Sequence, residues 1–198
     1  KQGSRLGSKS AEQELIISHP DVRRNLLWMK AYTEGMRALI LYTVYCMDME
    51  AASTSEEEKK KWQNRVELLT PISKAYSTDK GYEVCTRAIQ VHGGYGFMEE
   101  YAPASLARDC KIYSLWEGTN FIQAQDLVGR KWTMGKGKVF ADFLKDIDDF
   151  IAANKGSVPE LDKEFANLEK ALGSYREMMM AMGGYMAAGN LGAFQVFA

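Results

Sequence analysis

The sequence has little of what a metal site, a disulfide framework or a membrane span requires. It contains only two histidines and three cysteines, Cys46, Cys85 and Cys110, which lie far apart and form no CxxC pair. This pattern predicts free, mostly buried thiols in a reducing compartment, and it disfavours a zinc site. No apolar run approaches the roughly 18–20 residues that span a bilayer, and no signal peptide opens the sequence.

Charge of one sign is not in excess either. The 25 lysines and arginines nearly balance the 26 aspartates and glutamates, which leaves a formal net charge of −1. A nucleic-acid-binding or anionic-membrane-binding surface usually shows as a basic excess, so neither partner is predicted. The 198 residues, 46% of them hydrophobic, are enough for one large or two small globular domains.

Strand patterns are missing as well. No stretch keeps the two-residue alternation of a strand, and only four prolines interrupt the helical spacing of apolar residues, so the sequence predicts an all-α fold. A first helix is expected to begin after Ser18, its candidate N-cap, with Pro20 in the first turn, and to run to about Ala52. A second begins at "STSEEEKKKW", where a Ser or Thr caps the helix and three glutamates favour its N-terminal dipole.

Further along, the second helix contains Pro71, which leaves two alternatives open: one kinked helix, or two helices that abut there. Gly93 and Gly94 are expected to end it. Shorter helices are predicted over 103–113 and 120–132, and two amphipathic helices follow the "TMGKGK" linker.

The expected organisation has three parts. Residues 1–18 form a mobile lead-in from a missing upstream region, 19–132 a helix-bundle domain, and 133–198 a helical extension. The sequence begins without a methionine, so we expect it to be a piece of a longer protein.

The first candidate site is the stretch "AIQVHGGYGFMEEY". It places Gln90 and the bare backbone of Gly93 and Gly94 at a helix end. Such glycines permit the close approach of another backbone or of a phosphate-bearing ligand. The alternative is a helix C-cap followed by a tight turn.

The second candidate site is "SLWEGTNFIQ", where the helical pattern breaks and one carboxylate stands at the break. Glu117 lies between Trp116 and Gly118, with Thr119 following. One interpretation is a carboxylate favoured by the dipole of the next helix, with Thr119 as its cap. The other is a general base in a water-poor cleft.

These stretches carry a resemblance to a known family. The helix-ending Gly-Gly-Tyr-Gly, the Arg-Asp pair and the aromatic-Glu-Gly-Thr-Asn run resemble the C-terminal α-helical domain of the acyl-CoA dehydrogenases. "HPDVRRNLLWMKAYTEGMRAL", "DKGYEVCTRAIQVHGGYGF" and "NFIQAQDLVGRK" are most similar to the larger branch that includes methylthiopropanoyl-CoA dehydrogenase. Members of that branch carry an extra helical segment after the core.

The resemblance implies a role for each matching position. Glu117 corresponds to the catalytic glutamate that removes the α-proton of an acyl-CoA thioester while the β-hydrogen leaves as hydride to FAD. Trp116 and Gly118 correspond to substrate-binding positions. The cofactor-binding positions fall in two groups. Thr119 and Asn120 correspond to residues lining the enzyme's own FAD, whereas Gln90, Gly93 and Gly94 correspond to residues contacting the FAD of a neighbouring subunit.

The resemblance also implies partners. These are an acyl-CoA substrate, an electron-transferring flavoprotein and a homodimer or homotetramer, in the bacterial cytoplasm or, alternatively, the mitochondrion. Arg108 and Asp109 correspond to an Arg-Asp pair that we expect to position the Glu117 loop. Two other functions stay open. One is an acyl-CoA oxidase, which reduces oxygen, and the other is a non-catalytic helical module for oligomerisation or binding.

Overall fold

The computed structural model describes residues 1–4, 7, 12–190 and 192. Residues 5–6 and 8–11 of the expected lead-in, and residues 191 and 193–198 of the expected extension, lie outside the described residues. Every regular element of the described residues is helical, which confirms the all-α prediction. In chain order the elements are η1 (Ile16–Ser18), α1 (Pro20–Ala52), α2 (Glu56–His92), α3 (Gly94–Phe97), α4 (Ala102–Lys111), η2 (Ile112–Ser114), α5 (Asn120–Asp126), the π-helical η3 (Leu127–Lys131), η4 (Met134–Gly137), α6 (Lys138–Asn154), η5 (Pro159–Leu161) and α7 (Asp162–Ala187).

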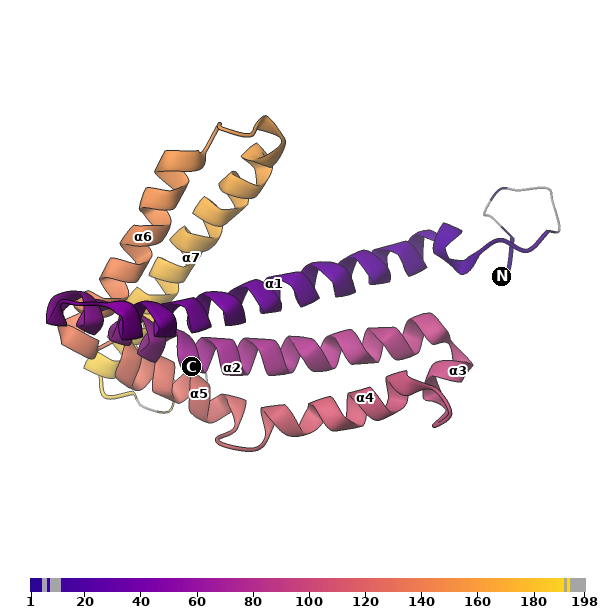
Figure 1. Ribbon diagram of the computed structural model, residues 1–198, viewed down its shortest axis with the longest axis horizontal. Helices are drawn as coiled ribbons and strands as arrows, with labels where there is room; N and C mark the ends of the chain where they lie inside the picture. The colour runs from indigo at the N-terminus through magenta and orange to yellow at the C-terminus, as the bar shows by residue number, and fades with distance from the viewer. Residues whose placement is uncertain (5–6, 8–11, 191, 193–198) are drawn as a thin grey trace. The chain divides into compact units, whose positions relative to one another are not determined.

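The chain divides into two compact units, Lys1–Gln123 and Ala124–Ala198. In the first unit α1 and α2 lie side by side and antiparallel, and α4 runs back along α2 (Figure 1). Leu68 and Leu69 of α2 and Cys46 of α1 are almost completely buried. Burial of each such side chain stabilises the bundle by roughly 1.5–3 kcal/mol.

The second helix is continuous through Pro71, which decides between the two alternatives left open by the sequence. Pro71 is itself buried. Ser55 is the N-cap, and its hydroxyl accepts a hydrogen bond from the Glu58 amide at 3.2 Å, as the sequence predicted. Gly93 ends the helix with φ +62°, whereas Gly94 already begins α3.

The predicted N-cap of the first helix is wrong. Ser18 closes the short 3₁₀ helix η1, and His19 occupies the N-cap position with an extended backbone. The reason is Pro20, because its ring excludes the residue before it from the helical region.

Two helix ends also differ from the prediction. The expected helix over 103–113 gives way to a 3₁₀ turn after Lys111, and the expected helix over 120–132 becomes a π-helix after Asp126. The predicted end of α1 at about Ala52 is confirmed.

A set of polar contacts joins α1 to α2. The guanidinium of Arg87 donates a hydrogen bond to the amide oxygen of the buried Asn25 at 2.7 Å and lies 4.0 Å from the ring centroid of Trp28. A cation over an aromatic face contributes about 0.5–1 kcal/mol or more when it is shielded from water. These contacts therefore fix the register of α1 against α2, in addition to the apolar packing between the two helices.

The second unit has its own core. Ile151 of α6 packs with Phe165 and Leu172 of α7. The indole N–H of Trp132 donates to the Tyr175 hydroxyl at 3.2 Å, and burial raises the pKa of that hydroxyl. Among the described residues, no helix combines the length and the apolar character that a membrane crossing demands.

Candidate functional site

The break between the helical patterns is a loop in which two successive residues are left-handed. Glu117 has φ +54° and Gly118 has φ +86°. The left-handed region is normal for glycine, but it costs a residue with a Cβ atom roughly 1–2 kcal/mol. A strained non-glycine residue of this kind persists only where its surroundings hold it in place.

The side chain of Glu117 is exposed, and so is that of Trp116, at 58%. The described residues of this chain therefore do not by themselves form the water-poor cleft that was expected around the carboxylate. The left-handed turn presents Glu117 outward from the bundle.

Three polar side chains fasten the loop to α2. The ammonium of Lys74 donates to the Gly118 carbonyl oxygen at 2.7 Å and to the Asn120 amide oxygen at 2.8 Å. The Asn120 amide nitrogen donates to the Thr78 hydroxyl at 2.9 Å and to the Ala75 carbonyl at 3.3 Å. Both ends of the Asn120 side chain are thus bonded within the chain.

Sequence reasoning missed Lys74 and Thr78. They lie four positions apart on α2 and so share one face of the helix. Their spacing alone resembles any half-buried polar face, so no local pattern marks them.

Thr119 has the capping role that was one of its two predicted roles. Its hydroxyl accepts a long hydrogen bond, 3.4 Å, from the Ile122 amide, and its carbonyl accepts one from the Gln123 amide at 3.1 Å. The side chain is otherwise exposed. Its correspondence to a cofactor-binding position stays a prediction.

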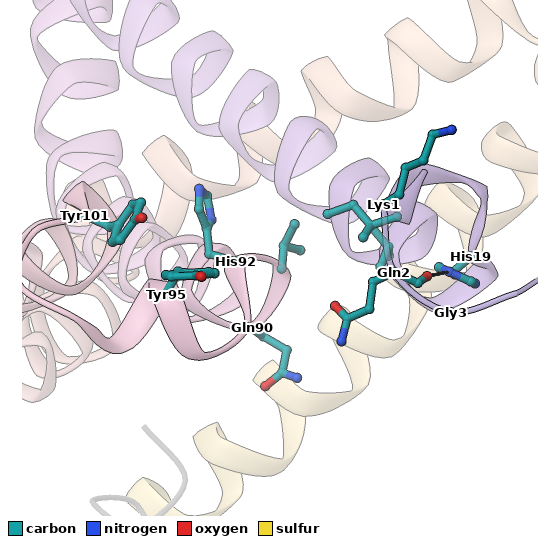
Figure 2. A pocket seen from close by; sticks show the side chains of 12 residues that line it. Lys1, Gln2, Gly3, His19, Gln90, His92, Tyr95 and Tyr101 are labelled. Carbon is teal, nitrogen blue, oxygen red and sulfur yellow. Dashed lines mark hydrogen bonds between the residues drawn. The ribbon is translucent and has the colours of Figure 1, made fainter. Parts of the chain in front are cut away.

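The other predicted group lies at the far end of α2. Gln90 and His92 line a hollow of about 750 Å³ together with Gly93, Tyr95 and His19. Figure 2 shows the side chains of Gln90, His92, Tyr95 and His19 around it. The His92 ring bonds back to the Ala88 carbonyl at 2.8 Å. Gly93 and Gly94 are exposed, and a Cβ at either position would meet nothing within 4 Å. The bare backbone there is open to an approaching group.

Within the chain, the close approach is made by a different glycine. A Cβ on Gly96 would lie 2.4 Å from the carbonyl oxygen of Ile89 and 2.9 Å from the Cβ of His92. Gly96 is buried, so the short helix α3 packs directly on the last turns of α2.

The two groups of predicted residues are well separated. Lys74, which holds the Glu117 loop, and Gln90 stand sixteen residues apart on the same helix. At 1.5 Å per residue this is about 24 Å along the helix axis. The structure brings together Trp116, Glu117, Gly118, Thr119 and Asn120, and places Gln90, Gly93 and Gly94 elsewhere.

The expectation that Arg108 and Asp109 position the Glu117 loop receives no support from the contact that Arg108 makes. Arg108 pairs instead with Glu99 at 3.4 Å, across the turn between α3 and α4. Both side chains are more than half exposed, so this pair contributes little to stability. In the part of the chain that the structure describes, no three His, Cys, Asp or Glu side chains gather as a metal site would require.

Comparison with known proteins identifies relatives of the chain. The family described as "Acyl-CoA dehydrogenase, C-terminal domain" matches residues 4–131. A butyryl-CoA dehydrogenase of Syntrophomonas wolfei is 52% identical over 164 residues, which cover 83% of this chain and 27% of the relative. The 3-methylmercaptopropionyl-CoA dehydrogenase of Ruegeria pomeroyi is 42% identical over 72% of this chain and 24% of the relative.

A third relative is named for a complex. Subunit CarC of the caffeyl-CoA reductase-Etf complex of Acetobacterium woodii is 36% identical over 51% of this chain and 23% of the relative. The chain thus spans about a quarter of the length of these three relatives.

Proposed function

Since the chain belongs to the acyl-CoA dehydrogenase family and matches the C-terminal helical domain of its members, we propose that it carries the base of an acyl-CoA α,β-dehydrogenation. In this proposal Glu117 removes the α-proton of an acyl-CoA thioester. FAD, when bound, supplies the acceptor for the β-hydrogen, which leaves as hydride. The observation that carries the proposal is the strained, braced turn that presents the Glu117 carboxylate.

In this proposal, Glu117 and its neighbours have different roles in the reaction. An α-proton is weakly acidic, so its removal requires a carboxylate held within hydrogen-bond distance of the reacting carbon and shielded from water. The exposed Trp116 ring and the Gly118 backbone flank Glu117 and in this proposal contact the acyl group. Because Glu117 is exposed in this chain, the elements that shield it come from the remainder of the protein.

The residues present fit a bound FAD in two places. Beside Glu117, the exposed Thr119 offers a hydroxyl, while Asn120 shapes the loop through its bonds to α2. At the far end of α2, the open backbone of Gly93 and Gly94 and the exposed Gln90 can accept a cofactor held by a neighbouring subunit. The separation of about 24 Å along α2 favours two different cofactor molecules and hence a homodimer or homotetramer.

The names of two relatives support a proposal for the substrate class. These relatives are named for butyryl-CoA and 3-methylmercaptopropionyl-CoA, so we infer a short, unbranched acyl-CoA for this protein. The relative named for an Etf complex favours an electron-transferring flavoprotein as the electron acceptor. The bacterial relatives favour the bacterial cytoplasm over the mitochondrion.

The test uses the full-length protein under anaerobic conditions. Short and long acyl-CoAs are added one at a time while the flavin absorbance is recorded, and a Glu117→Gln variant runs beside the wild type. We expect one short acyl-CoA to bleach the wild-type flavin and the variant to bleach about 10²–10⁴ times more slowly. A protein without flavin, or a variant that bleaches at the wild-type rate, favours the binding module.

The same protein separates dehydrogenase from oxidase. After reduction by substrate, air is admitted in one sample and an oxidised electron-transferring flavoprotein in another. Fast reoxidation by the flavoprotein and slow reoxidation by oxygen support the dehydrogenase, and the reverse order supports the oxidase.

A further inference from the structure

Lys74 contacts the Glu117 loop from the middle of α2. Its ammonium bridges the Gly118 carbonyl oxygen at 2.7 Å and the Asn120 side-chain amide oxygen at 2.8 Å, and so holds one backbone group before Thr119 and one side chain after it. The side chain is half-buried and reaches a loop 44 residues further along the chain. A hydrogen bond from a charged donor is stronger than one between neutral groups.

The carbonyl that Lys74 holds belongs to Gly118, the second residue of the left-handed pair Glu117 and Gly118. On the other side, the amides of Leu115 and Trp116 both donate to the Ile112 carbonyl, at 2.9 and 3.0 Å. The strained turn is therefore held at each end, by the 3₁₀ turn before it and by Lys74 after it.

Asn120 and Thr78 complete the brace. The Thr78 hydroxyl lies 2.9 Å from the amide nitrogen of Asn120, whose oxygen is held by Lys74. Ala75 accepts from the same amide nitrogen. Because Lys74, Ala75 and Thr78 all belong to α2, the brace transfers the rigidity of this helix to the loop.

We propose that Lys74 is a positioning residue for Glu117: its ammonium holds the Gly118 carbonyl and the Asn120 side chain, and so keeps the left-handed turn that aims the carboxylate. The importance of Lys74 for turnover rests on the proposed function of Glu117, whereas the contact of Lys74 with the loop is independent of that function. Without the brace the turn relaxes to ordinary dihedral angles, and the Glu117 carboxylate is no longer held in one orientation.

The test compares Lys74→Met with Lys80→Met in the full-length flavoprotein. Lys80 lies on the same helix but pairs with Glu83 and faces the Tyr32 ring, so its variant controls for the loss of a lysine from α2. Hydrogen exchange of the segment 112–123 is measured by mass spectrometry. Lys74→Met should raise exchange in this segment about tenfold, the equivalent of roughly 1.4 kcal/mol, and Lys80→Met should leave it unchanged.

Kinetics supply the second readout. For Lys74→Met we expect kcat to fall by roughly 10²-fold with little change in KM, because a small misplacement of a reacting group has this effect. The isotope effect with α-deuterated substrate should increase, since proton removal becomes more rate-limiting. A merely structural lysine would lower the melting temperature or the flavin content without changing the isotope effect of the folded fraction, and that result would overturn the proposal.

The two proposals fail separately. If exchange in 112–123 is the same in both lysine variants while Glu117→Gln is inactive, the positioning proposal is overturned and the proposed function stands. If Lys74→Met loosens the loop but Glu117→Gln turns over normally, the hold of Lys74 on the loop is supported and Glu117 is not the base.

Discussion

At the scale of single residues, the site depends on a backbone conformation that its central side chain disfavours. Glu117 is one of two described non-glycine residues with positive φ, the other being Lys136. A Cβ atom in this conformation approaches the following carbonyl oxygen, which is the origin of the strain. Stability alone therefore favours glycine at this position, whereas the placement of a carboxylate needs a side chain that strains the backbone.

This opposition predicts an unusual order of stabilities. Glu117→Gly should be more stable than Glu117→Ala by about 1 kcal/mol, because glycine has no Cβ to strain and alanine keeps it. Urea unfolding of the two variants measures the difference.

The exposed Glu177 in the middle of α7 is the matched control. There the order should reverse, with alanine more stable than glycine by about 1 kcal/mol. A Glu117→Ala variant as stable as Glu117→Gly would show that the turn carries no strain.

At the scale of elements, the sequence predicted helices well and their joints poorly. Ser55 and the glutamates after it formed a local capping signal, and the structure confirms it. Pro71 lies inside a helix because tertiary burial outweighs its local cost. Lys74 could not be predicted as a brace, because its partners Gly118 and Asn120 lie more than 40 residues away and no local pattern encodes the contact.

The joint between α2 and α3 predicts another contrast. Gly96→Ala should destabilise the first unit by roughly 1–3 kcal/mol, because its methyl group would overlap the Ile89 carbonyl. Gly94→Ala, two residues earlier and with open space around its Cβ, should change stability little. Thermal unfolding of both variants measures this. Equal melting temperatures would mean that α3 does not pack closely on α2.

At the scale of the whole molecule, α2 connects two candidate sites that the proposed function assigns to different cofactor molecules. Its middle holds the Glu117 loop, and its C-terminal end exposes Gln90, Gly93 and Gly94. If the second group serves a neighbouring subunit, each active site combines residues from two chains. The sequence resemblance predicted this division, and it stays a prediction.

Two inactive variants should therefore restore activity when mixed. Glu117→Gln lacks the base, whereas Gly94→Phe blocks the approach of the neighbour's cofactor and leaves Glu117 intact. In a mixed dimer, one site receives an intact Glu117 from one chain and an intact Gly94 from the other. Random association of equal amounts should recover about a quarter of the wild-type activity.

Co-expression followed by turnover measurement checks this expectation, with each variant alone as the control. If Gly94 and Glu117 served the same site of one chain, every mixed dimer would contain only defective sites. No recovery above the separate variants would then be seen.

The left-handed Glu117 also has a consequence for how this sequence position changes during evolution. Drift that preserves only folding should replace Glu117 by glycine or asparagine, the residues that accept this conformation most readily. A lineage that retains glutamate there keeps a residue less compatible with its backbone, and selection for turnover would oppose its loss. Among descendants of this domain, the residue at position 117 should therefore distinguish chains that still catalyse from chains that keep only the scaffold.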